Sequence, residues 1–245
     1  MRFTILTLFP RIFDSPLDES LLKKARQKGL VEFFIVNIRD FADDPHRTCD
    51  DYPYGGGPGM IMKIEPVYKA MKHVEEKFGR PHYVLLTPQG KILTQDLAQR
   101  LSRFDHLCLV CGRYEGIDER ILHFVDEEVS IGDYVLSGGE LAALVLIEAI
   151  SRLIPNVVGN ERSVFEDSLS EYLLEYPQYT RPRSFLGIEV PAILLSGNHE
   201  EIRRWRRKES IRKTLLKRPD LIERFRPRCE EDRRFLREAM EELCG

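Results

Sequence analysis

Glycine-rich clusters are the parts of this sequence whose composition and spacing most favour ligand chemistry. Three of them follow short apolar runs typical of buried strands, and open α/β sheets bind ligands at the ends of their strands. Glycine there lets the backbone approach a ligand or turn with positive φ, although any single cluster is also typical of a tight turn. Several such clusters in one domain predict a ligand site. They are Tyr54–Gly59, Thr87–Gly90, Gly112–Gly116, Ile131–Gly132 and Ser137–Gly139.

Several familiar chemistries lack their sequence patterns. There is no GxxxxGK[ST] and no GxGxxG after the first apolar run, which disfavours Walker-type and dinucleotide sites. HExxH, EF-hand and GxSxG patterns are absent as well, so we expect neither a tightly bound metal nor an α/β-hydrolase. The five cysteines form no disulfide framework. Cys108 and Cys111 are three apart in one apolar run, and a strand would point them to opposite faces, so we expect both to be structural.

Length and composition indicate a folded protein. The 245 residues suit one large domain, or a medium domain with an appendage, and a hydrophobic content of 42% can fill a core. No apolar run approaches the roughly 20 residues of a membrane span. The first nine residues alternate like a strand and lack a signal-peptide cleavage site, so we expect a cytoplasmic protein without membrane partners.

Charge is unevenly distributed along the chain. The net charge is −3, yet residues 200–237 hold fifteen Lys and Arg against eight Asp and Glu. A basic tail on an acidic body predicts a polyanionic partner, whereas a solvated helix face is the simpler alternative.

The order of expected elements predicts an α/β domain with a parallel sheet. We expect a helical stretch over Pro10–Gly29 and a polar loop over Asp40–Gly59. The segment Pro155–Tyr179 has little periodicity and is interpreted as a linker or lid, and Glu200–Glu242 should be helical with interruptions at Pro219 and Pro227. Expected strands are Arg2–Leu8, Phe33–Ile38, Tyr83–Thr87, Leu107–Cys111 and Glu127–Ser130, and further helices are Glu65–Phe78, Gln95–Ser102, a short one from Asp118, and Gly139–Ile154.

Three long motifs resemble those of the bacterial tRNA (guanine-N1)-methyltransferases, the TrmD family of the SPOUT superfamily. They are Tyr54–Met60 (YGGGPGM), Gly112–Arg120 (GRYEGIDER) and Ser130–Glu140 (SIGDYVLSGGE), with further matches at Leu194–His199 and Glu201–Arg206. The resemblance runs from Phe9 to about Pro219. It implies a SPOUT-type parallel sheet with a deep trefoil knot and a small C-terminal helical domain. It also implies methylation of the N1 of guanine at tRNA position 37 by S-adenosylmethionine.

The resemblance assigns the methyl donor to three loops of the knot, Leu86–Gly90, Cys111–Gly116 and Ser130–Gly139. Backbone groups of the third loop would hold the adenine and ribose. Glu115 would orient the cofactor or only cap the following turn. The cofactor-binding residues expected in this way are Leu86, Thr87, Pro88, Gln89, Gly90, Cys111, Gly112, Tyr114, Glu115, Gly116, Ser130, Ile131, Gly132, Asp133, Tyr134, Val135, Leu136, Gly138 and Gly139.

The same resemblance assigns two catalytic residues. Guanine N1 carries a proton at neutral pH and must lose it as the methyl group arrives, so a carboxylate within hydrogen-bond reach can act as base. Asp167 matches the family's base, and Arg152 matches the guanidinium that stabilises charge on O6. From the residues alone, Asp167 would be a solvated loop carboxylate and Arg152 a helix-end cation.

Substrate contacts are expected in two places. Asp50, Gly57 and Gly59 resemble the family's pocket for the target base, where Asp50 would accept from the guanine amine or else only form an Asx turn. In the basic tail, cations fall on more than one helix face, which favours an RNA backbone over an internal ladder of ion pairs. Those expected to bind tRNA are Arg203, Arg204, Arg207 and Lys208.

The prediction as a whole is an enzyme of three parts: residues 1–154 with the knot, a lid over 155–179 and a tRNA-binding helical domain over 180–245. The resemblance to SPOUT enzymes, which dimerise through the knot, implies a homodimer with a shared active site. The apolar helix Gly139–Ile154 is a candidate interface, unless it is buried within one chain. Mg²⁺ is a second candidate cofactor that no ligand pattern supports. The alternatives are a SPOUT enzyme acting on a ribose or on another RNA, and a non-catalytic RNA-binding module. Asp167 argues against the ribose, because ribose methylation removes no proton from a base nitrogen.

Overall fold

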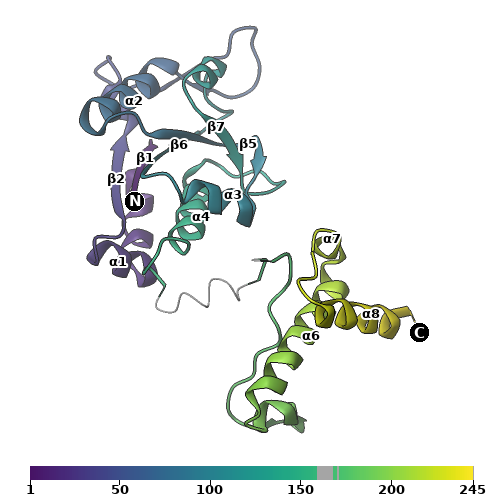
Figure 1. Ribbon diagram of the computed structural model, residues 1–245. Helices are drawn as coiled ribbons and strands as arrows, with labels where there is room; N and C mark the ends of the chain where they lie inside the picture. Colours follow the sequence, from purple (N-terminus) through teal and green to yellow (C-terminus); the bar gives the residue numbers. More distant parts are fainter. Residues whose placement is uncertain (159–167, 170, 245) are drawn as a thin grey trace. The chain divides into compact units, whose positions relative to one another are not determined.

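The computed structural model describes residues 1–158, 168–169 and 171–244, and the chain divides into two compact units (Figure 1). Met1–Asn160 form the first, here called the sheet unit, and Glu161–Gly245 form the second, called the helical unit. Within the described residues, every helix is too short or too polar to cross a lipid bilayer.

The sheet unit is built on five parallel strands in the order β2-β1-β6-β5-β7. Because all four neighbouring pairs are parallel, the carboxyl ends of the strands meet at one edge. The predicted α/β class with a parallel sheet is confirmed. The strands are β1 (Arg2–Thr7), β2 (Glu32–Asn37), β5 (His82–Ile92), β6 (His106–Cys111) and β7 (Glu127–Ser130).

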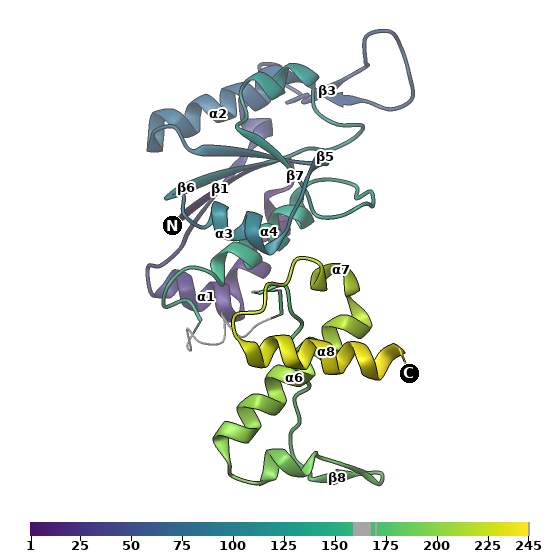
Figure 2. The ribbon, with the colours of Figure 1, turned by 45° about the vertical axis from the view of Figure 1, so that its right-hand side comes forward.

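Helices cover both faces of this sheet (Figure 2). Helix α2 (Ile64–Phe78) packs on one face, and α1 (Ser20–Gln27), α3 (Gln95–Leu101) and α4 (Glu140–Ser151) pack on the other. Side chains of each strand therefore alternate between two hydrophobic cores. Cys108 lies in the core under α2 and Cys111 in the other, which confirms that the two thiols cannot share a metal ion. Burial raises the pKa of both thiols.

Short elements depart from the expected pattern. The first half of the predicted helix over 10–29 is wrong: two 3₁₀ turns, Pro10–Phe13 and Pro16–Asp18, precede α1, because each proline starts a turn without an amide to donate. The expected polar loop contains a 3₁₀ turn (Ile38–Phe41) and β3 (Asp50–Asp51), which pairs with β4 (Ile61–Met62). Another 3₁₀ turn, Glu119–His123, stands where a short helix was predicted.

The helical unit contains a hairpin and three helices. The hairpin is β8 (Ser184–Phe185) and β9 (Ile188–Glu189), followed by a 3₁₀ turn (Ala192–Leu195), α6 (His199–Lys217), α7 (Pro219–Ile222) and α8 (Glu230–Cys244). Leu173, Ile211, Phe225 and Phe235 form its core, and the hydroxyl of Thr214 accepts a 2.7 Å hydrogen bond from the amide of Leu174. Part of the segment expected to be a linker thus packs within this unit.

Candidate active site

A cavity of about 460 Å³ opens at the carboxyl ends of β5, β6 and β7, the edge where the glycine clusters predicted a ligand site. Its wall combines the three expected loops. The cofactor residues expected from sequence that line it are Leu86, Thr87, Pro88, Gln89, Gly112, Tyr114, Glu115, Gly116, Ser130, Ile131, Gly132, Tyr134, Val135, Leu136, Gly138 and Gly139.

Three residues expected to contact the cofactor do not line the cavity. The side chain of Cys111 is fully buried, because it points from β6 into the core under α1, α3 and α4. Asp133 is exposed at the tip of its loop. Gly90 lies against the backbone of β7, where an added Cβ would be 2.4 Å from the carbonyl carbon of Glu128.

The segment Thr87–Gln89 forms part of the wall because it leaves the β5–β7 ladder. Leu86 and Lys91 both align with Val129, so the four residues between them bulge out of the sheet. The predicted strand end at Thr87 was therefore short, since β5 resumes and runs to Ile92. Gly90 makes this return possible because a side chain would collide with β7.

Glycines also bring the last loop close to β6. The amide of Gly139 donates to the carbonyl of Gly112 at 2.9 Å, and a Cβ on Gly139 would stand 2.9 Å from Cα of Cys111. A Cβ on Gly138 would lie 2.2 Å from Nε of Arg113. The Ser137–Gly139 turn therefore depends on glycine for its approach to β6, which is a physical reason for this part of the motif.

A buried ion pair fixes the start of α4, and sequence reasoning missed it. Glu140 is 1% exposed; its Oε2 lies 2.9 Å from Nε of Arg113, and its Oε1 accepts a 2.8 Å hydrogen bond from Thr7. The Arg113 guanidinium also stacks 4.4 Å from the ring centre of Phe9. Both partners stand inside the quoted motifs, but nothing in the sequence pairs residues so far apart. The pair ties the ends of β1 and β6 to the cavity loop.

Strands β3 and β4 and the loop over 52–60 between them, here called the glycine-rich hairpin, adjoin this cavity through Glu115. The amide of Glu115 donates to the carbonyl of Met60 at 3.0 Å, and a Cβ on Gly59 would be 2.5 Å from Cγ of Glu115. Gly57 and Asp50 belong to the same hairpin, although neither lines the cavity itself. The structure thus brings only one of the three expected base-pocket residues into contact with the cavity wall.

Of the two expected catalytic residues, the structure describes Arg152 alone. Asp167 lies outside the described residues. Arg152 caps the carboxyl end of α4, whereas Ala142 is the last residue of that helix that lines the cavity. At a rise of 1.5 Å per residue, the two Cα atoms are about 15 Å apart along the helix. Arg152 therefore lies far from the cavity of its own sheet unit.

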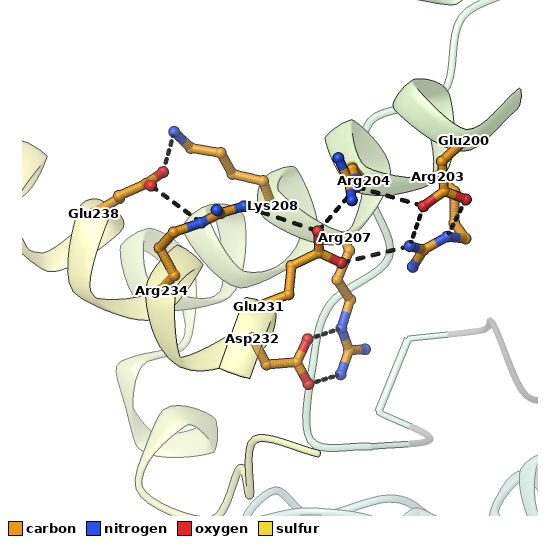
Figure 3. A network of polar contacts seen from close by, with 9 residues as sticks. All are labelled: Glu200, Arg203, Arg204, Arg207, Lys208, Glu231, Asp232, Arg234 and Glu238. Carbon is orange, nitrogen blue, oxygen red and sulfur yellow. Dashed lines mark hydrogen bonds and ion pairs between the residues drawn. The ribbon is translucent and has the colours of Figure 1, made fainter. Parts of the chain in front are cut away.

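The cations expected to bind RNA form an internal ladder between α6 and α8 (Figure 3). Arg207 donates two 2.8 Å hydrogen bonds to the carboxylate of Asp232, which is 3% exposed, and this holds the pKa of Asp232 below its usual value. The distribution of these cations in the sequence favoured an RNA backbone over such a ladder. The remaining pairs are Arg203 with Glu200 and Glu231, Arg204 with Glu200 and Glu231, and Lys208 with Glu238 and Glu242.

In the described part of the chain, no three His, Cys, Asp or Glu side chains gather in a way that could hold a metal ion.

Comparison with known proteins identifies the family. The model of tRNA (Guanine-1)-methyltransferase TrmD matches residues 1–224. The tRNA (guanine-N(1)-)-methyltransferase of Dictyoglomus turgidum is 53% identical over 99% of this chain and 98% of its own, and that of Caldanaerobacter subterraneus subsp. tengcongensis is 52% identical over 99% and 100%. The crystal structure of tRNA (m1G37) methyltransferase from Aquifex aeolicus superposes with a TM-score of 0.75 at 42% identity, covering 91% of this chain and 95% of that one. This chain therefore belongs to the TrmD family of tRNA (guanine-1)-methyltransferases.

Proposed function

We propose that the protein transfers a methyl group from S-adenosylmethionine to the N1 of guanine 37 in tRNA. The observation that carries this proposal is the glycine-walled cavity at the carboxyl edge of the sheet, formed by the loops that carry the family motifs. When bound, S-adenosylmethionine supplies the methyl group. We further infer that these loops cross as the deep trefoil knot of SPOUT enzymes.

The cavity suits a ligand of this size and chemistry. A volume of about 460 Å³ is in the range of small-molecule sites, and its wall mixes apolar side chains with exposed backbone groups. Leu86, Ile131 and Leu136 offer contacts to an adenine ring. The peptide groups of Gly132 and Tyr134 lie at the same wall, where the Tyr134 amide donates to the Gly132 carbonyl at 2.9 Å. Mg²⁺ remains a candidate second cofactor, and the proposed reaction assigns it no role.

The protein's own residues would manage the proton and the developing charge. Asp167 would accept the proton from N1, and Arg152 would donate to O6 of the guanine as negative charge builds there. Asp50, Gly57 and Gly59 would hold the base, with Asp50 accepting from its N2 amine. Contact between the hairpin and Glu115 supports this arrangement, because it joins the base pocket to the cofactor cavity.

We infer that the active site is shared between two chains. Arg152 stands about 15 Å along α4 from the cavity of its own chain, which is beyond the reach of one side chain. Leu141, Val145, Glu148 and Arg152 fall on one stripe of α4 at helical spacing. A two-fold axis that pairs this stripe antiparallel with its copy would carry Arg152 toward the partner's cavity.

Exposure on α4 supports the dimer. One side of the helix is buried in its own chain, at Ala143, Leu146 and Ile147, which accounts for only part of its apolar surface. On the other side, Leu141 is 56% and Val145 47% exposed. Apolar side chains at this exposure in adjacent turns are typical of a surface that a second copy covers.

The helical unit would hold the tRNA, and residues 155–179 would close over both substrates. Contact of Arg203, Arg204, Arg207 and Lys208 with RNA remains a prediction. Each of these cations would have to leave a carboxylate to reach a phosphate. The predicted domain limits, 1–154, 155–179 and 180–245, also remain predictions. The contacts within the chain place one boundary, after residue 160.

Titration calorimetry with S-adenosylmethionine separates this proposal from a non-catalytic RNA-binding module. We expect saturable binding by the wild-type protein and none by Gly138→Trp, because a side chain at this lining residue would collide with Arg113 and Glu140 and disturb the cavity wall. Gly29→Trp, at a turn with open space around it, is a control for general disturbance. A protein that binds tRNA but no S-adenosylmethionine would contradict the proposal.

A further inference from the structure

A second hollow of about 570 Å³ lies wholly within the helical unit. Its walls are the extended segment after Tyr176, the turn before α6, and the first turns of α6 itself. Its lining includes the side chains of Tyr176, Tyr179, Arg181, Arg183, Leu194 and Arg206. We call this hollow the tyrosine–arginine groove.

Arg206 differs from its neighbours on α6 in direction and in partners. At 100° per residue, position 206 is 160° from position 204 and 100° from position 207 around the helix, so Arg206 lies to one side of the ladder with α8. Its guanidinium stacks 4.8 Å from the ring centre of Tyr176, and it has no carboxylate within ion-pair distance among the described residues. It is exposed, and its charge is available to a ligand.

The second cation of the groove is also without an acidic partner. Arg181 is exposed and forms no ion pair within the described parts of the chain. Among the described residues, Arg183 forms an ion pair with Glu189 alone, at 3.5 Å, and both side chains are largely exposed. The groove therefore carries a net positive charge, whereas carboxylates neutralise the more basic face toward α8.

Tyrosine rings beside arginines are suited to unpaired nucleotides. Tyr179 is 48% exposed, and a free base can stack on such a ring while guanidinium groups contact its phosphate. A base within a duplex offers only its edge, so a ring in a groove cannot stack on it. Leu194 adds an apolar wall.

We propose that the tyrosine–arginine groove binds an unpaired nucleotide of the tRNA, with its phosphate on Arg206 and Arg181 and its base on Tyr179. The proposal rests on the proposed function for the identity of the RNA. It assigns the principal RNA contact of the helical unit to this groove rather than to the α6–α8 ladder.

Binding of an unmodified tRNA transcript, followed by fluorescence anisotropy at several salt concentrations, tests the proposal. Arg206→Gln and Arg181→Gln should each raise the Kd about five- to tenfold and lower the salt slope by roughly 0.7–0.9, as expected for one lost phosphate contact. Tyr179→Leu should raise the Kd about tenfold with an unchanged slope, because stacking involves no counterion. Arg233→Gln is the matched control, an exposed arginine of the same unit paired with Glu230 at 3.0 Å, and its Kd should change less than twofold.

Thermal unfolding and the Kd for S-adenosylmethionine should be unchanged in all four variants, and Arg206→Lys should keep the salt slope. If the groove variants kept the wild-type Kd and salt slope and still methylated tRNA, the groove would not be a nucleotide site. The proposed function would be unaffected. Loss of dimers in Arg206→Gln would overturn it in favour of a second copy as occupant. A wild-type protein that neither binds nor methylates tRNA would overturn the proposed function first.

Discussion

Gly59 and Glu115 are in direct contact: a Cβ on Gly59 would lie 2.5 Å from Cγ and 2.6 Å from Oε1 of Glu115. The two residues come from the glycine-rich hairpin and from the wall of the cavity. Their contact joins the expected base pocket to the expected cofactor site, so a substitution in one site should alter binding at the other.

Gly59→Ala should displace the Glu115 side chain and raise the KM for tRNA about tenfold. Gly56→Ala is its matched control, because Gly56 has a similar φ of +75° against +81° but open space around it. Both substitutions strain a left-handed residue at a cost of about 1 kcal/mol. The midpoint temperature of thermal unfolding should therefore fall equally in both variants. The KM for tRNA, measured by steady-state kinetics, should rise in Gly59→Ala alone. Equal KM values would show that Glu115 does not couple the two sites.

Asp167→Asn should lower the single-turnover rate of methyl transfer by about 10² to 10⁴, the usual contribution of a positioned base. The Kd for S-adenosylmethionine should stay within twofold of the wild-type value, since the amide keeps the shape of the carboxylate. Rapid-quench measurements with saturating tRNA would report the rate. An Asn variant that keeps most of that rate would mean that another group accepts the proton.

Acid should weaken the helical unit through Asp232. Arg207 holds the pKa of Asp232 below its usual value of about 4, so the ionised pair stabilises the fold above that pH. This stabilisation should be lost as pH falls below about 4, through the lower pKa of the folded state. Urea unfolding followed by the fluorescence of Trp205, the single tryptophan, should show a steeper loss between pH 4 and 2 in the wild type than in Asp232→Asn.

The same pair predicts a stability effect for Arg207. Arg207→Ala leaves Asp232 buried without its cation and should lower the free energy of unfolding by on the order of 3 kcal/mol. Arg233→Ala, which breaks an exposed pair, should change it by less than about 1 kcal/mol. Similar values for the two variants would mean that the ladder does not hold α6 to α8.

Much of the fold could be predicted from local patterns. The alternation in Leu107–Cys111 predicted a two-faced strand, and the glycine clusters after β5, β6 and β7 predicted the edge at which the cavity opens. These features depend on residues close together in sequence, where side-chain direction follows from backbone period.

Longer-range pairings could not be read in this way. The basic pattern of α6 appears free in sequence because its partner Asp232 comes 25 residues after Arg207. The same holds for Glu140 with Arg113 and Thr7, and for the return of β5 after its bulge. Ion pairs between separate elements depend on packing, which periodicity within one helix does not report.

Mixed dimers test the shared active site. Asp167→Ala and Gly138→Trp should each be inactive alone, the first without a base and the second with a disturbed cavity wall. If the cavity of one chain works with Asp167 of the other, each mixed dimer has one intact site, and random exchange should restore roughly a quarter of the sites. Methyl transfer by the mixture, measured after mass spectrometry has demonstrated exchange, decides the matter. A mixture that stays inactive would contradict a shared site.

Identification of the modified nucleoside tests the proposed methyl transfer to the N1 of guanine 37. The protein would be incubated with methyl-labelled S-adenosylmethionine and an unmodified tRNA transcript carrying guanine at position 37, and the digest would be separated by chromatography and mass spectrometry. The account predicts that all label appears as 1-methylguanosine and that none appears in the same transcript with adenine at position 37. Label in a 2′-O-methylated nucleoside, in another base, or in no nucleoside at all would contradict it.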